Sequence, residues 1–144
     1  MKIAICASIS FTDKIKEVAG LLSGRGYEVE IPFTSQRIIN GELTLEQFLA
    51  EKQKNGDGAL RKIHDDLLKR YYEIIKNFDA VLVVNMTKNN IENYIGGNTL
   101  IEMAFAYVLD KKIFLFNPIP EISYKDEIMA MQPIILNGDL DKIH

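Results

Sequence analysis

Continuous apolar runs alternate with amphipathic segments along this chain. Lys2–Ala7 and Asp79–Met86 are apolar without a period of two, which is typical of strands covered on both faces. Shorter runs predict three further strands over Tyr27–Ile31, Lys112–Phe116 and Pro133–Leu136. The chain is therefore expected to contribute five strands to a buried sheet.

The segments between these strands carry apolar residues at helical spacing. This spacing predicts helices over Asp13–Ser23, Thr44–Asn55, Ala59–Lys76, Thr99–Leu109 and Asp126–Met131. Thr44 and Gln47 have the spacing of a capping box, and Gly56-Asp57-Gly58 is expected to separate the second helix from the third. The third helix carries an apolar stripe of Leu60, Ile63, Leu67, Tyr71 and Ile74.

Alternation of apolar strands with helices predicts an α/β fold, with a parallel sheet between two helical layers. Right-handed crossovers restrict the strand order, and we expect the order 2-1-3-4-5. No repeat, low-complexity tract or linker divides the chain. We therefore expect one domain over residues 1–144, with a helical insertion at about 33–70.

Composition narrows the classes of function. Seventeen Lys and Arg residues stand against twenty Asp and Glu residues, a formal net charge of −3, so we expect no nucleic-acid partner. One cysteine and two histidines predict no resident metal and no disulfide. No apolar run is long enough to span a membrane and none resembles a signal peptide, which favours a cytoplasmic location.

Ligands of an open parallel sheet bind beyond the carboxyl ends of its strands, near the point where the strand order reverses. Polar residues follow the first, third and fourth strands. The expected substrate-binding residues are Ser8, Ile9, Ser10, Asn85, Gly96, Gly97, Asn98, Thr99 and Asn117.

Gly96 and Gly97 stand at the start of the helix that follows the third strand. They allow a ligand to approach the backbone closely, and unpaired N–H groups at a helix start suit an anionic group. The segment matches neither a Walker loop nor a Gly-x-Gly-x-x-Gly fingerprint, so no cofactor is expected.

Glu102 has two interpretations. Thr99 and Glu102 have the spacing of a capping box, in which the carboxylate only satisfies the helix start. Alternatively, Glu102 is a carboxylate in the first helical turn, kept ionised by the helix dipole, that faces the cleft as a nucleophile.

Other residues at this edge also have structural interpretations. The hydroxyl groups of Ser8 and Ser10 could satisfy local backbone groups. Asn89, Asn90 and Asn93 are typical turn residues, and Cys6 is expected to be an inert buried thiol.

The motifs together resemble a known family. Cys6-Ala7-Ser8-Ile9, Asp79-Ala80-Val81-Leu82-Val83, and Glu102 followed by Ala104, Ala106 and Leu109 are similar to the nucleoside 2-deoxyribosyltransferase superfamily. That superfamily includes the 2′-deoxynucleoside 5′-phosphate N-hydrolases. The likeness covers most of the chain and is poorest over Pro32–Arg70.

The resemblance implies a flavodoxin-like sheet, a homodimer or higher homo-oligomer, and cleavage or transfer at the N-glycosidic bond of a small nucleoside or nucleotide. It implies that Glu102 is the nucleophile of a retaining double displacement and that Ser8 contacts the substrate. Tyr71 stands at the position of a family Asp and is its candidate catalytic replacement, with Asp65 and Asp66 as the alternatives. Gly96, Ser10 and Met129 replace a family Asp, Arg and Ser.

These departures leave two alternatives to an enzyme. The chain could be a nucleotide-binding sensor of the same fold that has lost turnover. It could also be a partner-binding protein in which Pro32–Arg70 forms an interaction helix pair.

Overall fold

The first strand of the sheet sends alternate side chains into two separate cores. The computed structural model describes residues 1–54 and 57–144, and the side chains outside 52–65. In it β1 (Lys2–Cys6) places Ile3 and Ile5 in one apolar core and Ala4 and Cys6 in the other. Burial on both faces explains why this run is apolar without alternation.

The sheet confirms the predicted fold class and strand order. β2 (Glu28–Glu30), β1, β3 (Ala80–Val83), β4 (Lys112–Leu115) and β5 (Ile134–Ile135) lie side by side in that order, and every pair is parallel. The strands are shorter than their apolar runs because ladder pairing stops early. Cys6 pairs with Val83 and Val83 with Leu115, which brings these carboxyl ends to one edge.

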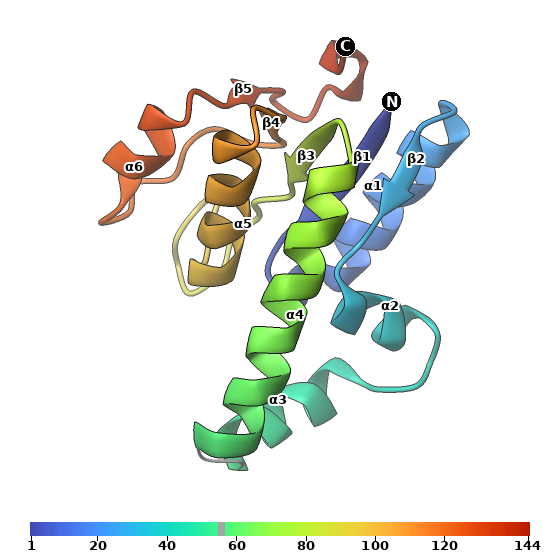
Figure 1. Ribbon diagram of the computed structural model, residues 1–144, viewed down its shortest axis with the longest axis vertical. Helices are drawn as coiled ribbons and strands as arrows, with labels where there is room; N and C mark the ends of the chain where they lie inside the picture. Colours follow the sequence, from blue (N-terminus) through green and yellow to red (C-terminus); the bar gives the residue numbers. More distant parts are fainter. Residues whose placement is uncertain (55–56) are drawn as a thin grey trace.

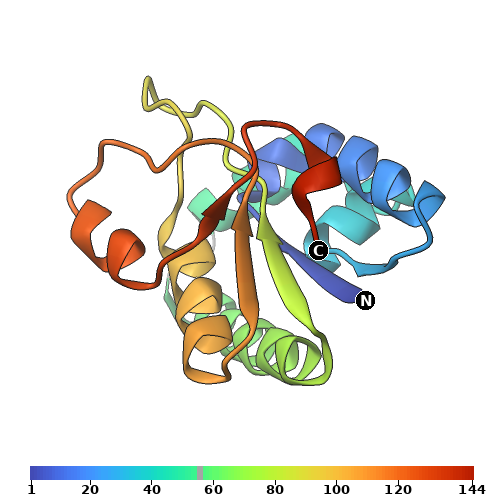
Figure 2. The same cartoon turned by 90° about the horizontal axis from the view of Figure 1, so that it is seen from above.

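Helices cover both faces of the sheet, as the flavodoxin-like arrangement requires (Figure 2). One layer is α1 (Thr12–Gly24) with the 3₁₀ turn η2 (Leu140–Lys142). The other layer is α4 (Asp57–Asn77), α5 (Gly97–Val108) and α6 (Lys125–Ala130).

Two shorter helices and most of α4 occupy the predicted insertion. α2 (Phe33–Ile39) and α3 (Leu45–Lys54) follow β2, and α3 and α4 project beyond the carboxyl ends of the strands (Figure 1). The capping box at the start of α3 is confirmed, because Thr44 and Gln47 exchange two hydrogen bonds of 3.0 Å. Both helices therefore stand over the edge where ligands of such sheets bind.

Part of the predicted break between α3 and α4 lies outside the described residues. Gly56 belongs to that part, whereas Asp57 and Gly58 already lie in α4. The side chains of Leu60 and Ile63 on the predicted stripe also lie outside the description. Within the described chain, no helix is both long and apolar enough to cross a membrane.

Candidate functional site

A cavity of about 430 Å³ opens at the carboxyl end of β1, among α2, α3, α4 and the first turns of α5. This volume is within the range of small-molecule sites. The cavity brings together nine of the eleven residues expected at the site: Ser8, Ile9, Ser10, Tyr71, Gly96, Gly97, Asn98, Thr99 and Glu102.

The loop after β1 forms a 3₁₀ turn, η1 (Ile9–Phe11), at the cavity wall. Ser8 caps this turn, because its Oγ accepts a hydrogen bond of 3.4 Å from the backbone N–H of Ser10. The Ser8 hydroxyl therefore satisfies local backbone and lines the cavity as well. The two interpretations made from the sequence are compatible.

Helix α5 starts two residues earlier than the spacing predicted. Gly96 is the N-cap residue in an extended conformation, and its carbonyl accepts the first helical hydrogen bond from Leu100 at 2.9 Å. A Cβ atom on Gly96 would lie 3.3 Å from the Tyr94 ring, so a larger residue there would displace that ring by a few tenths of an ångström. The N-cap residue is a glycine and so has no side chain to cap the helix, and Gly97 and Asn98 of the first turn line the cavity.

The capping-box interpretation of Thr99 and Glu102 is wrong. Both residues lie inside α5, and Glu102 stands in its second turn. The helix dipole acts mainly on the first turn, so it does not keep this carboxylate ionised. Instead, burial raises the pKa of Glu102 from 4.5 to about 8. The sequence-based prediction that the Glu102 carboxyl group is ionised at neutral pH is therefore wrong.

The Glu102 carboxyl group lies in the cavity wall with only 8% of the residue exposed. It forms no hydrogen bond with any residue of the described part of the chain. A buried carboxyl group that has no hydrogen-bond partner among the described residues and lines a ligand-sized cavity is available for chemistry.

Tyr71 reaches the same cavity from α4, but its hydroxyl group donates a hydrogen bond to the backbone carbonyl of Ile5. Burial raises the pKa of Tyr71 well above its ordinary value, and the charges of Cys6, Glu102 and Glu30 add to that effect. The Tyr71 phenol is therefore a neutral group that ties α4 to β1.

Lys88 is a cavity residue that sequence reasoning missed. Its Nζ donates a hydrogen bond of 3.0 Å to Ser8 Oγ and lies 5.4 Å from the centre of the Tyr94 ring. Asn89 and Asn90 follow with φ values of 52° and 60°, which close a tight two-residue turn between Lys88 and Ile91. In the sequence, the Asn89-Asn90 pair was the signal for a turn that places Lys88 at the cavity.

Asn85 and Asn117 do not line the cavity. The Asn85 side chain is fully buried, and its Nδ2 donates to the carbonyls of Asn117 and Pro118 at 3.1 and 3.0 Å. Its Oδ1 accepts from the Asn117 N–H at 2.9 Å. These two residues hold the ends of β3 and β4 together beneath the site.

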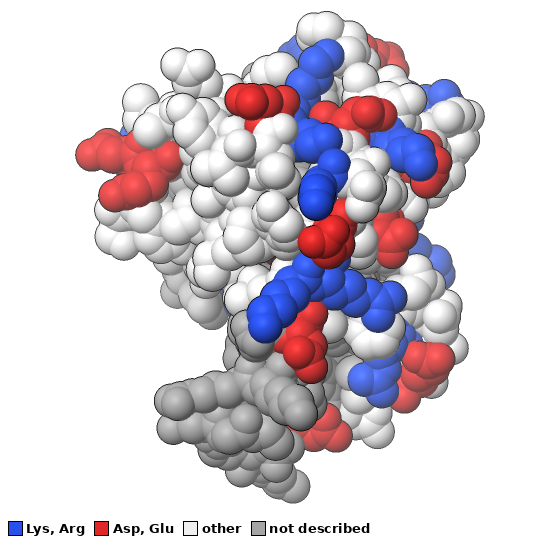
Figure 3. Space-filling view, in the orientation of Figure 1, with Lys and Arg blue, Asp and Glu red and all other residues white. Residues whose placement is uncertain are grey.

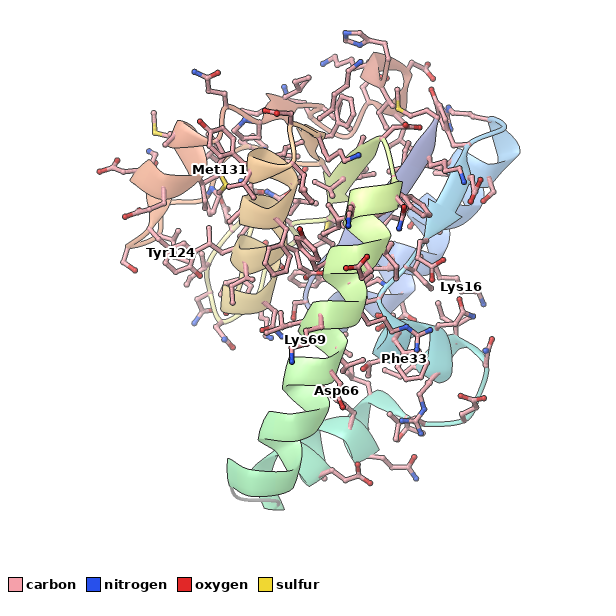
Figure 4. The ribbon with its side chains drawn as sticks, viewed as in Figure 1. Lys16, Phe33, Asp66, Lys69, Tyr124 and Met131 are labelled. Atoms are coloured by element: carbon pink, nitrogen blue, oxygen red, sulfur yellow. The ribbon has the colours of Figure 1, made fainter. Side chains whose placement is uncertain are left out.

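The helices of the insertion supply an apolar wall to the cavity. This wall consists of Phe33 from α2, Phe48 and Leu49 from α3, and Leu67, Leu68 and Ile74 from α4. Phe33 lies beside α4, where the guanidinium of Arg70 stacks 4.5 Å from the centre of its ring (Figure 4). Of the predicted α4 stripe, Leu67, Tyr71 and Ile74 line the cavity, and Tyr71 and Ile74 also pack in the core that contains Ala4 and Cys6.

Cys6 is fully buried, and burial raises its pKa well above the ordinary value, with Glu102 adding to the effect. The thiol is held neutral and enclosed, which is the character expected from its place inside a strand. Among the described residues, no group of three or more His, Cys, Asp or Glu side chains could hold a metal ion.

Comparisons with protein-family models, curated proteins and solved structures found no match to this chain.

Proposed function

We propose that this protein cleaves or transfers at the N-glycosidic bond of a nucleoside or nucleotide, with Glu102 as the nucleophile. The observation that carries the proposal is the Glu102 carboxyl group, which is buried without a hydrogen-bond partner in the described chain and open to the cavity. The sequence likeness to nucleoside 2-deoxyribosyltransferases supports the same chemistry.

In the first step a Glu102 oxygen forms a bond to C1′ of the sugar while the C1′–N bond breaks. The electron pair of that bond leaves with the base, which takes a proton from solvent. In the second step a water oxygen attacks C1′, releases the Glu102 carboxylate and loses its proton. Two displacements retain the configuration at C1′, and a second base in place of water gives transfer.

The pKa of Glu102 sets the pH dependence of this chemistry. A pKa of about 8 leaves about nine in ten carboxyl groups protonated at pH 7 in the empty site. Only the ionised form is a nucleophile, so the rate should rise with pH up to about 8 and then level. If Glu102 were instead a general acid, the rate would fall across the same range.

A positive end of the cavity supports a substrate with an anionic group. Lys88 Nζ and Ser8 Oγ lie 3.0 Å apart, and Gly97 and Asn98 at the start of α5 line the same cavity. Ammonium, hydroxyl and backbone N–H groups together suit a phosphate. We therefore favour a nucleoside 5′-monophosphate over the free nucleoside.

The direct test is release of free base from deoxynucleosides and ribonucleosides and from their 5′-monophosphates, with and without an acceptor base. We expect Glu102→Gln and Glu102→Ala to abolish release, because they remove the nucleophile. Glu17→Gln, which alters an exposed carboxylate on α1, should leave it unchanged. Mass spectrometry of a slow substrate should find the sugar attached to Glu102. No release by the unaltered protein, or equal release by Glu102→Ala, overturns the proposal.

A second candidate is a nucleotide sensor without turnover. The hydrogen bond of the Tyr71 hydroxyl favours the sensor. The hydroxyl group has one proton and donates it to the Ile5 carbonyl, so it cannot also donate to an attacking carboxylate and position it. Thermal shifts distinguish the candidates. A sensor is stabilised by a nucleotide that remains intact after prolonged incubation, whereas an enzyme consumes it.

We also propose that the partner is a second copy of this chain, packed on the outer face of α5. Ile101, Tyr107 and Val108 on that helix are 40%, 51% and 70% exposed. Glu102 is the only charged residue of α5, and it is buried. The surface over α5 is accordingly almost free of charge (Figure 3). An exposed apolar helix face of this kind is typical of a protein interface.

A further inference from the structure

The Lys88 ammonium group is contacted from two directions in the cavity wall. Its Nζ donates a hydrogen bond of 3.0 Å to Ser8 Oγ and lies 5.4 Å from the centre of the Tyr94 ring. The face of an aromatic ring attracts a cation, and the attraction is stronger where water is partly excluded. Lys88 and Tyr94 are both half-buried and both line the cavity, so solvent weakens this attraction less than it would on an open surface.

The Tyr94 ring is carried by backbone that is anchored on both sides of it. The Tyr94 N–H donates a hydrogen bond of 2.7 Å to the carbonyl of Met86, at the end of the loop that follows β3. The next residue, Ile95, accepts a hydrogen bond on its carbonyl from the hydroxyl group of Tyr124, the N-cap residue of α6. The ring is therefore a fixed surface against which a flexible lysine side chain can rest.

Gly96 leaves the room that this ring occupies. A Cβ atom on Gly96 would lie 3.3 Å from Cε1 and 3.4 Å from the hydroxyl oxygen of Tyr94. The backbone of Gly96 is extended, with a φ of −84° that any residue can adopt, so its conformation does not require glycine. The missing side chain instead lets the Tyr94 ring lie close to the start of α5.

We propose that Tyr94 is a positioning residue for Lys88, and that its ring holds the ammonium group beside Ser8 Oγ to receive the anionic group of the substrate. This inference rests on the proposed function, because it takes that anionic group to be a 5′-phosphate. A lysine held in place before binding loses less side-chain freedom when the phosphate arrives, which increases affinity. Tyr94 acts only through Lys88 and is not a catalytic residue.

Inorganic phosphate is the probe, because it has the anionic group and no glycosidic bond. Phosphorus NMR titration of the full chain measures its affinity. Tyr94→Leu removes the ring and keeps an apolar side chain, so we expect phosphate to bind about fivefold more weakly. Tyr94→Phe keeps the ring and should change the affinity less than twofold. The matched control is Tyr27→Leu, at a second tyrosine that is partly buried against the same core, and it should also change the affinity less than twofold.

A double variant separates positioning from a structural role. Lys88→Met alone should weaken phosphate binding about tenfold. If the ring acts through Lys88, Tyr94→Leu should weaken binding less than twofold further once Lys88→Met is present. If Tyr94 only supported the fold around the site, Tyr94→Leu would cause the same fivefold loss with and without Lys88→Met.

Proton NMR of the unaltered protein tests the contact without relying on the folding of a Tyr94 variant. The ring current of Tyr94 should shift the ε-CH₂ signals of Lys88 upfield of the other lysine signals. Lys88→Met identifies these signals, because they disappear from its spectrum. Lys88 signals at the ordinary lysine position would show that the ammonium group does not rest on the ring.

The outcomes separate this inference from the proposed function. Unshifted Lys88 signals, no loss of affinity in Tyr94→Leu, an equal loss in Tyr94→Phe, or additive losses in the double variant overturn the positioning role of Tyr94. Absence of phosphate binding by the unaltered protein overturns it as well, together with the preference for a 5′-monophosphate. Absence of base release from any nucleoside or nucleotide, with the phosphate results as expected, overturns the glycosidic chemistry alone.

Discussion

Lys88 Nζ donates a hydrogen bond of 3.0 Å to Ser8 Oγ and so joins two loops that lie 80 residues apart in the chain. One loop follows β1 and the other follows β3, the two strands between which the order of the sheet reverses. The bond brings a positive charge to the candidate site of a protein whose net charge is −3. It is also the contact by which the proposed preference for a 5′-monophosphate can be tested.

Replacement of Lys88 should separate nucleotides from nucleosides. Lys88→Met keeps most of the side-chain length and removes the charge, so we expect affinity for a 5′-monophosphate to fall about tenfold or more. Affinity for the matching nucleoside should change less than twofold. Titration calorimetry measures both. Lys14→Met on α1 is the control, and an equal loss for nucleoside and nucleotide would contradict a phosphate contact.

Glu102 should make stability depend on pH. Its folded-state pKa of about 8 lies above the ordinary value of 4.5, so the folded protein holds a proton that the unfolded chain releases between those values. Stability from this group is complete below about pH 4.5 and is lost as pH rises to about 8. The loss is roughly 5 kcal/mol at most.

The matched variant is Glu102→Gln, which carries no titrating group. Relative to the unaltered protein it should gain stability from pH 5 to pH 8, with no further change by pH 9. Denaturant unfolding at several pH values measures this difference. A difference that is constant with pH would show that Glu102 titrates normally.

Tyr71→Phe tests whether the Tyr71 hydroxyl takes part in chemistry. The hydroxyl donates to Ile5, so we expect a loss of about 1 kcal/mol in the free energy of unfolding. The rate of base release should stay within about threefold, because the proposed nucleophile is Glu102 and not Tyr71. A fall of a hundredfold or more in kcat, with stability retained, would instead assign Tyr71 a catalytic role.

Asn85→Ala should destabilise the edge of the sheet where the carboxyl ends of β3 and β4 meet. Asn85 is fully buried, and its amide binds the backbone at Asn117 and Pro118, so its removal leaves buried groups without partners. We expect a loss of roughly 2–4 kcal/mol in the free energy of unfolding. The control is Asn40→Ala, at an exposed position at the end of α2, with an expected loss below about 0.5 kcal/mol. Similar losses for both variants would contradict this role.

The proposed second copy makes the oligomeric state sensitive to one residue of α5. Val108→Lys puts a charge on a side chain that is 70% exposed, so it should disrupt a dimer without unfolding the subunit. Sedimentation velocity should find a dimer for the unaltered protein and a monomer for the variant. Leu21→Lys on α1 is the control and should remain a dimer. A monomeric unaltered protein would contradict this interface.

Local sequence was sufficient for the fold class. The apolar runs of β1 and β3 carry no alternation because helices cover both faces, and this property is readable in any window of five residues. The Thr44 and Gln47 capping box was predictable for the same reason, since both partners lie within one turn. The similar spacing of Thr99 and Glu102 predicted a capping box that does not form, because the N-cap residue of that helix is Gly96 and both residues lie inside the helix.

The sequence by itself determined the parallel sheet, its strand order and the edge at which the cavity opens, because these follow from short-range periodicity and the handedness of crossovers. The tertiary structure alone decided the character of the site. The pKa of Glu102 depends on how much water is displaced by elements distant in the chain, and Lys88 reaches Ser8 only once β1 and β3 pair. Desolvation and long-range contact are properties of the packed molecule, and no local window of sequence contains them.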